Sequence, residues 1–249
     1  MNTFFVKNSH LHSGIAKVVG DDFHHIKNVL RIKIDEEVYI CDEDENKFIA
    51  KLAEIRDDMA VFDILGKVER VSELPVNITL YQGMPKSDKL EQIIKESTQL
   101  GVFEIIPVNM EHSVVKLDNT SIDKKLERWQ KIALEASKQS GRQKIPSISR
   151  VINFENIIEN IGKYDIVLLL YELENSFTLK DAISKAKSSI DSIKNIAIII
   201  GPEGGLSREE VNKLSSYDNL YTCTLGGRIL RTELAPIMVL SNLVYEFEL

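Results

Sequence analysis

The sequence lacks the features that mark several large classes of protein. Its 249 residues include only two cysteines, Cys41 and Cys223, which lie far apart without metal-site spacing, so we expect two buried, reduced thiols. No apolar run approaches the roughly 20 residues of a membrane span, and residues 196–200 form at most a buried strand. The N-terminus, MNTFFVKNSH, has the pattern of neither a signal nor a transit peptide. We therefore expect a cytoplasmic protein.

An excess of positive charge is also missing. The chain has 31 basic and 38 acidic residues and a net charge of -7, which argues against a surface that binds polyanions all over. A local basic patch is still compatible with this balance, because phosphate contacts need only a few lysines and arginines. The proportions of hydrophobic residues (43%) and charged residues (28%) are usual for a globular protein. The length suits one large domain or two small ones.

Phosphate-binding motifs are absent, although one loop is rich in glycine. The loop, Gly201-Pro202-Glu203-Gly204-Gly205, follows an apolar run but matches neither G-x-x-x-x-G-K-[ST] nor G-x-G-x-x-G. Its carboxylate, Glu203, would repel a phosphate group. Two interpretations stay open: a structural turn, or a loop whose exposed backbone groups bind a neutral base or an amino-acid moiety.

The first part of the chain predicts a small, curved β-sheet. Alternating apolar and polar residues indicate strands over residues 3–7, 14–19, 37–41, 47–55 and 59–65. A helix is expected over residues 21–30, with Asp21 or Asp22 as its N-cap. Residues 67–75, charged and ending in proline, look like a linker.

The end of this first helix is basic and rich in histidine. Adjacent histidines cannot share one helix face and no cysteine lies near them, so we expect no metal site there. The cationic face is either solvated or in contact with RNA, and the sequence leaves both open. Its residues are His24, His25, Lys27, Arg31 and Lys33.

From residue 76 strands alternate with helices, which predicts an α/β domain with a largely parallel sheet. Strands are expected over residues 76–81, 104–108, 165–171, 195–200 and 220–225. One helix is expected after residue 88, with Asp88 and Glu91 as its capping box. A second should run from about residue 122 to Gly141. A third should begin after Ser207, which forms a capping box with Glu210. In such sheets ligands bind at the carboxyl ends of the strands. The loops at residues 171–172, 201–205 and 225–232 therefore predict one shared pocket.

The stretch LGGRILRTELAP at residues 225–236 concentrates glycines and charges at the end of a strand. Pro236 fits only the first turn of a helix, so the helix should begin near Thr232 or Glu233. Arg231 and Glu233 would then lie at a rigid junction of strand, turn and helix. Glu233 either stabilises the helix N-terminus or belongs to a functional site.

Five segments carry a resemblance to a known family. IGPEGG and LGGRILRTELA resemble the signatures of the RsmE family, which are bacterial 16S rRNA uracil-N3 methyltransferases of the SPOUT superfamily. HHIKNVLRIK, MPKSDKLEQIIKESTQLGV and ERWQKIALEASKQSGRQKIP agree with it and extend the match over nearly the whole chain. Two positions depart from the family pattern: Leu234 replaces a threonine, and Asp35-Glu36 replaces a Gly-Asp pair.

The resemblance implies the fold and the partners. Residues 1–72 would form a PUA-like β-barrel that binds RNA, and residues 73–249 a SPOUT α/β domain whose last helix threads a loop to make a trefoil knot. The enzyme would be a homodimer that acts on 16S rRNA of the small ribosomal subunit. The apolar C-terminal helix fits a dimer interface and a monomer core equally well. A non-catalytic rRNA-binding or ribosome-assembly protein of the same fold is the alternative.

The resemblance also implies the site. Methyl transfer to uracil N3 requires loss of the N3 proton, and Glu233 is the candidate base by type and position. Arg231 would stabilise negative charge that develops on the uracil carbonyls. S-adenosylmethionine would contact Leu170, Tyr171, Gly201, Glu203, Gly204, Gly205, Leu225, Gly226, Ile229, Leu230 and Thr232. RNA contacts are expected from His25, Arg31, Lys33, Lys86, Arg142, Lys144 and Arg228.

Overall fold

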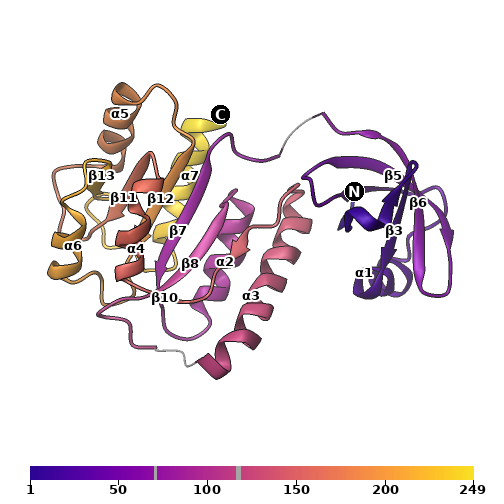
Figure 1. Cartoon of the computed structure of the whole chain (residues 1–249), viewed down its shortest axis with the longest axis horizontal. Helices are drawn as coiled ribbons and strands as arrows, with labels where there is room; N and C mark the ends of the chain where they lie inside the picture. Colours follow the sequence, from indigo (N-terminus) through magenta and orange to yellow (C-terminus); the bar gives the residue numbers. More distant parts are fainter. Residues whose placement is uncertain (70–71, 116–118) are drawn as a thin grey trace. The chain divides into compact units, whose positions relative to one another are not determined.

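The computed structural model of the chain divides into two compact units (Figure 1). It describes residues 1–69, 72–115 and 119–249, and of residues 119–121 the backbone only. The first unit comprises residues 1–73 together with residues 137–144, and the second comprises residues 74–136 and 145–249. Residues 137–144 thus pack with the first unit, although they lie inside the segment expected to form the second domain.

The first unit is built around a six-stranded sheet in the order β1-β4-β5-β6-β3-β2. All neighbours are antiparallel except β1 and β4. Alternate residues point into one core, where Phe62, Ile40 and Leu52 are fully buried. The bounds of β4 and β5 are those predicted. The strands are β1 (Thr3–Phe5), β2 (Leu11–His12), β3 (Ile15–Val19), β4 (Glu37–Cys41), β5 (Lys47–Ile55) and β6 (Met59–Lys67).

The helix of this unit begins earlier than predicted and changes its winding. α1 (Gly20–His24) continues as a π-helix, η2 (His25–Leu30). Its N-cap is Val19 and makes no side-chain hydrogen bond, so the predicted aspartate cap is wrong. Asp21 and Asp22 lie in the first turn, where negative charge favours the helix dipole. Asp22 also accepts a hydrogen bond from Lys138 at 2.6 Å.

The turn at Asp35 keeps the backbone conformation that glycine prefers. Asp35 has a φ of 67°, in the left-handed region, which aspartate tolerates better than most residues. Its N–H donates to the Leu52 carbonyl at 2.8 Å, and its carboxylate accepts from Lys51 at 3.0 Å. The departure from the family pattern at this position therefore leaves the turn between Lys33 and β4 closed.

The second unit contains a seven-stranded parallel sheet in the order β10-β8-β7-β12-β11-β13, with β9 paired to β8. Every residue of β11 is buried, as expected for a strand covered on both faces. The predicted bounds of β12 are confirmed, whereas β13 ends two residues early. The strands are β7 (Asn77–Gly83), β8 (Glu104–Asn109), β9 (Ser147–Ile148), β10 (Ile152–Asn153), β11 (Ile166–Leu170), β12 (Asn195–Ile200) and β13 (Leu220–Cys223).

Helices cover both faces of this sheet (Figure 1). One face packs against α2, α3, α5 and α7 around Leu80, Leu168 and Ile198, and the other against α4 and α6 around Val167 and Ile199. The helices are α2 (Lys89–Gln99), α3 (Asn119–Ser140), α4 (Glu155–Asn160), α5 (Leu179–Ser189), α6 (Arg208–Leu214) and α7 (Ala235–Phe247), and a short 3-10 turn, η3 (Ile161–Lys163), follows α4.

Two helix starts of the second unit have a capping box, and a third, where a box was predicted, has none. Ser207 and Glu210 form the predicted box before α6. Thr178 and Asp181 form a second box before α5, which was not predicted from the sequence. At α2 the predicted box is wrong, because Asp88 makes no side-chain cap bond and the carboxylate of Glu91 pairs with Arg128 at 2.6 Å.

The last helix also starts later than predicted. α7 begins at Ala235, after a turn in which the N–H groups of Leu234 and Ala235 both donate to the Arg231 carbonyl. Pro236 lies in its first turn, as expected. The helix is not apolar all round: Val239, Leu240 and Leu243 are buried, whereas its exposed positions include polar residues.

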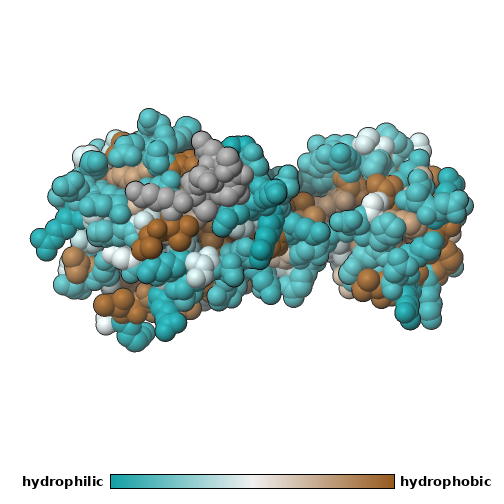
Figure 2. Space-filling view, turned by 90° about the horizontal axis from the view of Figure 1, so that it is seen from below, coloured by the Kyte–Doolittle hydropathy of each residue, from teal (hydrophilic) through white to brown (hydrophobic). Residues whose placement is uncertain are grey.

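Hydrophilic residues cover most of the face seen in Figure 2, and hydrophobic residues form small, separate patches. Within the described residues, no helix is both long and apolar enough to cross a membrane. Cys41 and Cys223 are both buried and free. Burial raises the pKa of each thiol to about 12, so both are protonated and unreactive at neutral pH.

Candidate functional site

A cavity of about 690 Å³ lies where β11, β12 and β13 end. Three loops line it, residues 170–172, 200–205 and 223–232, together with five side chains from other segments: Lys89, Glu174, Asn175, Thr178 and Ala235. All the residues expected to bind the cofactor therefore line one cavity within the second unit. Arg228 and Arg231 line it as well.

The glycine-rich loop is folded so tightly that side chains would not fit. A Cβ on Gly201 would lie 2.8 Å from the backbone carbon of Gly205. Gly205 has a φ of +71°, and a Cβ there would lie 2.2 Å from Glu172 Oε1. Gly204 packs against His112, whose ring nitrogen Nδ1 donates to the Gly204 carbonyl at 2.9 Å. These contacts require glycine and keep the loop backbone at the cavity wall.

A buried hydrogen-bond chain fastens this loop to the last turn before α7. The hydroxyl of Thr232 donates to the Gly201 carbonyl at 2.8 Å and accepts from Gln82 Nε2 at 3.0 Å. Gln82, at the end of β7, is fully buried and donates also to the Gly83 carbonyl at 3.0 Å. Thr232 therefore lines the cavity while its hydroxyl serves the loop, not a helix cap.

Replacing Thr232 by valine is expected to lower the free energy of unfolding by about 1–3 kcal/mol. Valine has nearly the same shape but leaves Gln82 Nε2 and the Gly201 carbonyl short of a partner in a buried place. Chemical denaturation measures the change, and Thr222→Val, on the half-buried edge strand β13, is the matched control. Equal stabilities of the two variants would contradict this role of the hydroxyl.

Lys89 joins two carboxylates beside the cavity. Its Nζ lies 3.1 Å from Glu203 Oε1 and 3.1 Å from Glu233 Oε2. Glu233 is 15% exposed, and its other oxygen, Oε1, lies 4.0 Å from Arg231 Nη1. The side chain of Arg231 is 85% exposed. Two cations and two anions thus form one chain of charges, with its arginine end in solvent.

This arrangement keeps the two carboxylates ionised. Desolvation opposes ionisation of Glu233, but its own backbone N–H, Lys89 and Arg231 outweigh it and lower its pKa. The pKa of Glu203 is lowered in the same way, against desolvation, by backbone N–H groups and by Lys89. The pKa of Lys89 is raised by Glu233 and Glu203. All three groups are charged at neutral pH.

The loop after β11 is held by its own carboxylate. Glu174 accepts hydrogen bonds from the N–H and hydroxyl of Ser176 and from the N–H of Phe177, at 2.7 to 3.0 Å. These hydrogen bonds, chiefly the one from the Ser176 N–H, lower the pKa of Glu174 from 4.5 to about 2. This stabilisation is therefore complete above about pH 4.5 and is lost as the pH falls toward 2. The loop is fixed at neutral pH.

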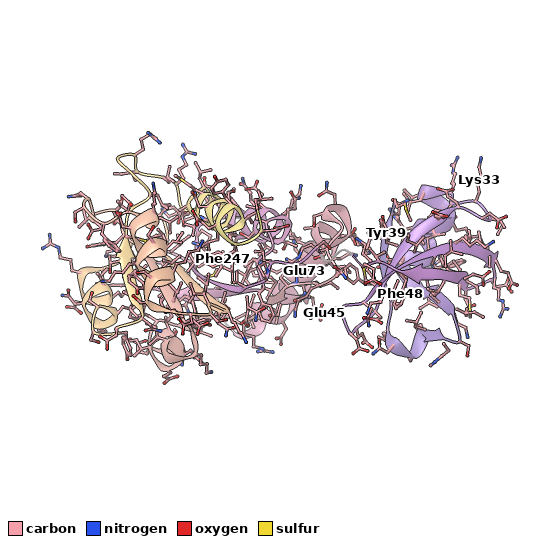
Figure 3. The ribbon with its side chains drawn as sticks, turned by 90° about the horizontal axis from the view of Figure 1, so that it is seen from above. Lys33, Tyr39, Glu45, Phe48, Glu73 and Phe247 are labelled. Carbon is pink, nitrogen blue, oxygen red and sulfur yellow. The ribbon has the colours of Figure 1, made fainter. Side chains whose placement is uncertain are left out.

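Some of the side chains expected to contact RNA are exposed, and others are engaged in ion pairs within the protein. His25, Arg31 and Lys33 are exposed in the first unit, and Lys33 projects from its surface (Figure 3). Lys86 and Arg228 are exposed in the second unit.

Two other expected RNA contacts are engaged within the first unit. Arg142 is 3% exposed and forms an ion pair with Glu73, and Lys144 pairs with Glu45. The backbone N–H groups of Gln143 and Lys144 also donate to Glu73, at 2.9 and 3.1 Å. This carboxylate therefore organises the end of the segment at residues 137–144, and burial keeps the Arg142 guanidinium from the surface.

Lys89 and Gln82 belong to the site but were missed from the sequence, whereas Glu172 lies in the loop at residues 171–172 that was expected to line the pocket. Gln82 had one visible signal, because it is a polar residue at the carboxyl end of an apolar strand. Lys89 had none, since a lysine in the first turn of a helix is usually a solvated charge. Among residues 1–69, 72–115 and 119–249, no group of three or more His, Cys, Asp or Glu side chains could hold a metal ion.

Two family models match the chain. The model described as an RNA methyltransferase domain matches residues 72–244, and the one described as an RNA methyltransferase PUA domain matches residues 20–65. The ribosomal RNA small subunit methyltransferase E of Bacillus subtilis is 37% identical over 232 residues, which are 93% of this chain and 90% of that protein.

Solved structures of similar proteins cover almost the whole chain. A ribosomal RNA small subunit methyltransferase E from Neisseria gonorrhoeae, bound to S-adenosyl methionine, is 26% identical with a TM-score of 0.84, and covers 99% of this chain and 98% of its own. A putative methyltransferase from Legionella pneumophila, in complex with the same cofactor, is 27% identical with a TM-score of 0.83, and covers 98% and 97%.

Proposed function

This chain belongs to the RNA methyltransferase family that includes the ribosomal RNA small subunit methyltransferase E proteins, and we propose that it methylates N3 of a uridine in 16S rRNA, with S-adenosylmethionine as methyl donor. One observation carries the proposal: three loops far apart in sequence line a single cavity, and Arg231 extends from its rim into solvent. The ribosomal subunits on which such an enzyme acts lie in the cytoplasm.

The cavity fits a cofactor of this size and chemistry. Its volume lies in the range of pockets for small molecules, and its walls combine apolar side chains with loop backbone. Leu170, Leu225 and Ile229 offer apolar contacts, and the glycines of residues 201–205 leave backbone groups accessible. When bound, S-adenosylmethionine supplies an electrophilic methyl group on a positively charged sulfur. The remaining expected contacts are Tyr171, Glu203, Gly226, Leu230 and Thr232.

The chain's own residues have to manage the charge on the uracil ring. N3 carries a proton in neutral uridine, and its loss places negative charge on the two neighbouring carbonyl oxygens. The guanidinium of Arg231 donates hydrogen bonds and stays protonated, so it suits stabilisation of this charge and cannot act as a base. Glu233 is the candidate proton acceptor. Because its pKa is lowered, it is ionised but weakly basic, and we assign the larger share of the effect to Arg231.

We propose that the exposed cations hold the RNA. His25, Arg31 and Lys33 follow one another along the helix and the following segment of the first unit. Lys86 and Arg228 would contact RNA in the second unit, beside the proposed catalytic residues. The uridine would have to leave its helix or be unpaired, because N3 takes part in base pairing.

Replacing both Arg31 and Lys33 by glutamate is expected to weaken RNA binding and to reduce its dependence on salt. Each lost phosphate contact lowers the slope of log Kd against log salt by roughly 0.7 to 0.9, so two contacts lower it by about 1.5. Fluorescence anisotropy with a labelled 16S rRNA fragment at several salt concentrations measures the slope. Replacement of Lys7 and Lys17 by glutamate, both exposed in the first unit, changes the net charge equally. If both double variants keep the wild-type slope, the face around Arg31 is only solvated.

We also propose that the second domain is a SPOUT-type trefoil knot. The segment after β13, at the edge of the sheet, returns to its centre, where Thr232 lies buried against Gly201 and Gln82. α7 then packs against α2 and β12. The return of this segment to lie against the loop of residues 201–205 supports the knot. Domain limits of 1–72 and 73–249 remain our proposal for the chain.

A homodimer is proposed for the same enzyme. Leu234 is 51% exposed just before α7, and Tyr245 is 69% exposed near the other end of this helix, so both ends of α7 leave apolar surface uncovered. Light scattering after gel filtration measures the mass in solution. A mass of about 28.3 kDa, that of one chain, would contradict the dimer.

Calorimetric titration with S-adenosylmethionine tests the proposed function at its first step. We expect saturable binding at one site per chain and weaker binding of ATP, because the cavity has no phosphate-binding motif. Binding of S-adenosylmethionine below detection would contradict the enzyme assignment and favour a non-catalytic rRNA-binding protein. Tighter binding of ATP would point to a nucleotide-dependent enzyme instead.

A further inference from the structure

We propose that Lys89 is a positioning residue that couples the glycine-rich loop to the turn that carries Arg231 and Glu233. The inference rests on the proposed function and adds to it a residue outside the three loops. Lys89 is the first residue of α2, so its backbone belongs to a helix packed on the core of the second unit. Its ammonium is 3.1 Å from a carboxylate of the loop and 3.1 Å from a carboxylate of the turn.

A second contact ties the same loop to the same helix start. The backbone N–H of Lys86 donates to both carboxylate oxygens of Glu203, at 3.0 and 3.2 Å. Glu203 is therefore held by the segment before α2 as well as by the Lys89 side chain. The loop of residues 201–205 cannot move away from α2 without breaking these contacts.

The turn has its own connection to this charge chain. Glu233 Oε2 is buried toward Lys89, while Glu233 Oε1 faces Arg231 at 4.0 Å. Lys89 therefore fixes the carboxylate that lies next to the exposed guanidinium. Since the side chain of Lys89 is 31% exposed and lines the cavity wall, it lies near the proposed site of methyl transfer without extending into solvent as Arg231 does.

Removal of this ammonium has a defined electrostatic result. The carboxylates of Glu203 and Glu233 would face each other with Arg231 as the one cation of this cluster left beside them. Like charges at short range disfavour ionisation, so the pKa of Glu233 should rise from its lowered value. Either Glu233 becomes protonated at a higher pH or one carboxylate turns away, and both disturb the position of Arg231.

The test compares Lys89→Met with Lys89→Arg, and uses Lys95→Met, an exposed lysine on the same helix, as control. Single-turnover methylation of 16S rRNA is measured from pH 5 to 9, together with calorimetric affinity for S-adenosylmethionine. We expect Lys89→Met to lower the rate about 10- to 100-fold, the usual cost of misplaced reacting groups. The acid limb of its pH profile should move to higher pH. Lys89→Arg should recover most of the rate, and Lys95→Met should match wild type.

A double variant keeps the proposal testable if Lys89→Met is unstable. Lys89→Met with Glu203→Gln removes one carboxylate together with the cation, so it should fold better than Lys89→Met alone and return the acid limb toward the wild-type pH. A wild-type rate and pH profile for Lys89→Met would overturn the proposal. If the wild-type protein binds S-adenosylmethionine but does not methylate rRNA, the proposed function is overturned instead. In that case the affinity of Lys89→Met for S-adenosylmethionine, which we expect to fall a few-fold, still tests whether Lys89 couples the loop to the turn.

Discussion

Replacement of Arg231 by alanine should lower the rate of methyl transfer by about 10²- to 10³-fold, the range found when one donor is removed from an oxyanion site. The side chain is 85% exposed and its nearest carboxylate contact is at 4.0 Å, so its loss costs the fold little. The affinity for S-adenosylmethionine and the melting temperature should therefore stay close to wild type. Single-turnover assays with 16S rRNA measure the rate, and calorimetry measures the affinity.

Glu233→Gln is the informative comparison for this variant. Because the pKa of Glu233 is lowered, the carboxylate is a weak base, and its loss should slow the reaction less than the loss of Arg231 does. A wild-type enzyme that needs ionised Glu233 is active above its folded pKa and loses activity as the pH falls through it. The relative loss in Glu233→Gln should be largest at low pH, where the uridine anion is scarcest, and should shrink as the pH rises. A pH profile parallel to that of the wild type would count against Glu233 as a base. Undiminished turnover of Arg231→Ala would refute the role of Arg231.

Gly201→Ala should weaken binding of S-adenosylmethionine about 5- to 150-fold. The added methyl group would meet the backbone of Gly205 at 2.8 Å and of Leu206 at 3.0 Å, so the loop itself has to move. Overpacking of this kind costs about 1–3 kcal/mol, and each 1.4 kcal/mol is a factor of ten in Kd. The Gly201 carbonyl also accepts from Thr232, so the movement reaches the turn before Arg231.

Gly162→Ala is the matched control for the loop variant. A Cβ at Gly162 meets nothing within 4 Å, and this residue lies in η3, outside the cavity. It should keep wild-type affinity and a melting temperature at or slightly above that of the wild type, because alanine restricts the unfolded chain. Calorimetry and thermal unfolding of both variants separate a local effect on the pocket from general instability. Wild-type affinity of Gly201→Ala would contradict the close packing of the loop.

The strands and the glycine loops were predictable because their determinants are local. Apolar alternation fixed β4 and β5, and a continuous apolar run fixed β12, each with the observed bounds. Helix starts were less predictable, since a cap depends on which partner a side chain chooses. Glu91 binds Arg128 across the unit in place of capping α2, and Thr232 binds Gly201 in place of starting α7.

The candidate site was predictable in its loops but not in its supports. Glycine-rich and charged segments at strand ends marked three cavity walls. Lys89 enters the site only because the fold brings segments more than a hundred residues apart together, and no local pattern encodes that. Gln82 had only its polar side chain at the end of an apolar strand as a signal. The same limit applies to Arg142, whose neighbours in sequence give no sign of the buried ion pair with Glu73.

Nucleoside mass spectrometry of 16S rRNA shows directly whether this chain methylates N3 of a uridine. Small subunits from a strain that lacks this protein are incubated with the purified enzyme and S-adenosylmethionine carrying a labelled methyl group, in parallel with the Arg231→Ala variant. We expect 3-methyluridine to be missing from the untreated rRNA, to appear with the label after treatment with wild-type enzyme, and to stay near background with the variant. Unlabelled 3-methyluridine already present in the mutant strain, or a label on any other nucleoside, would contradict it.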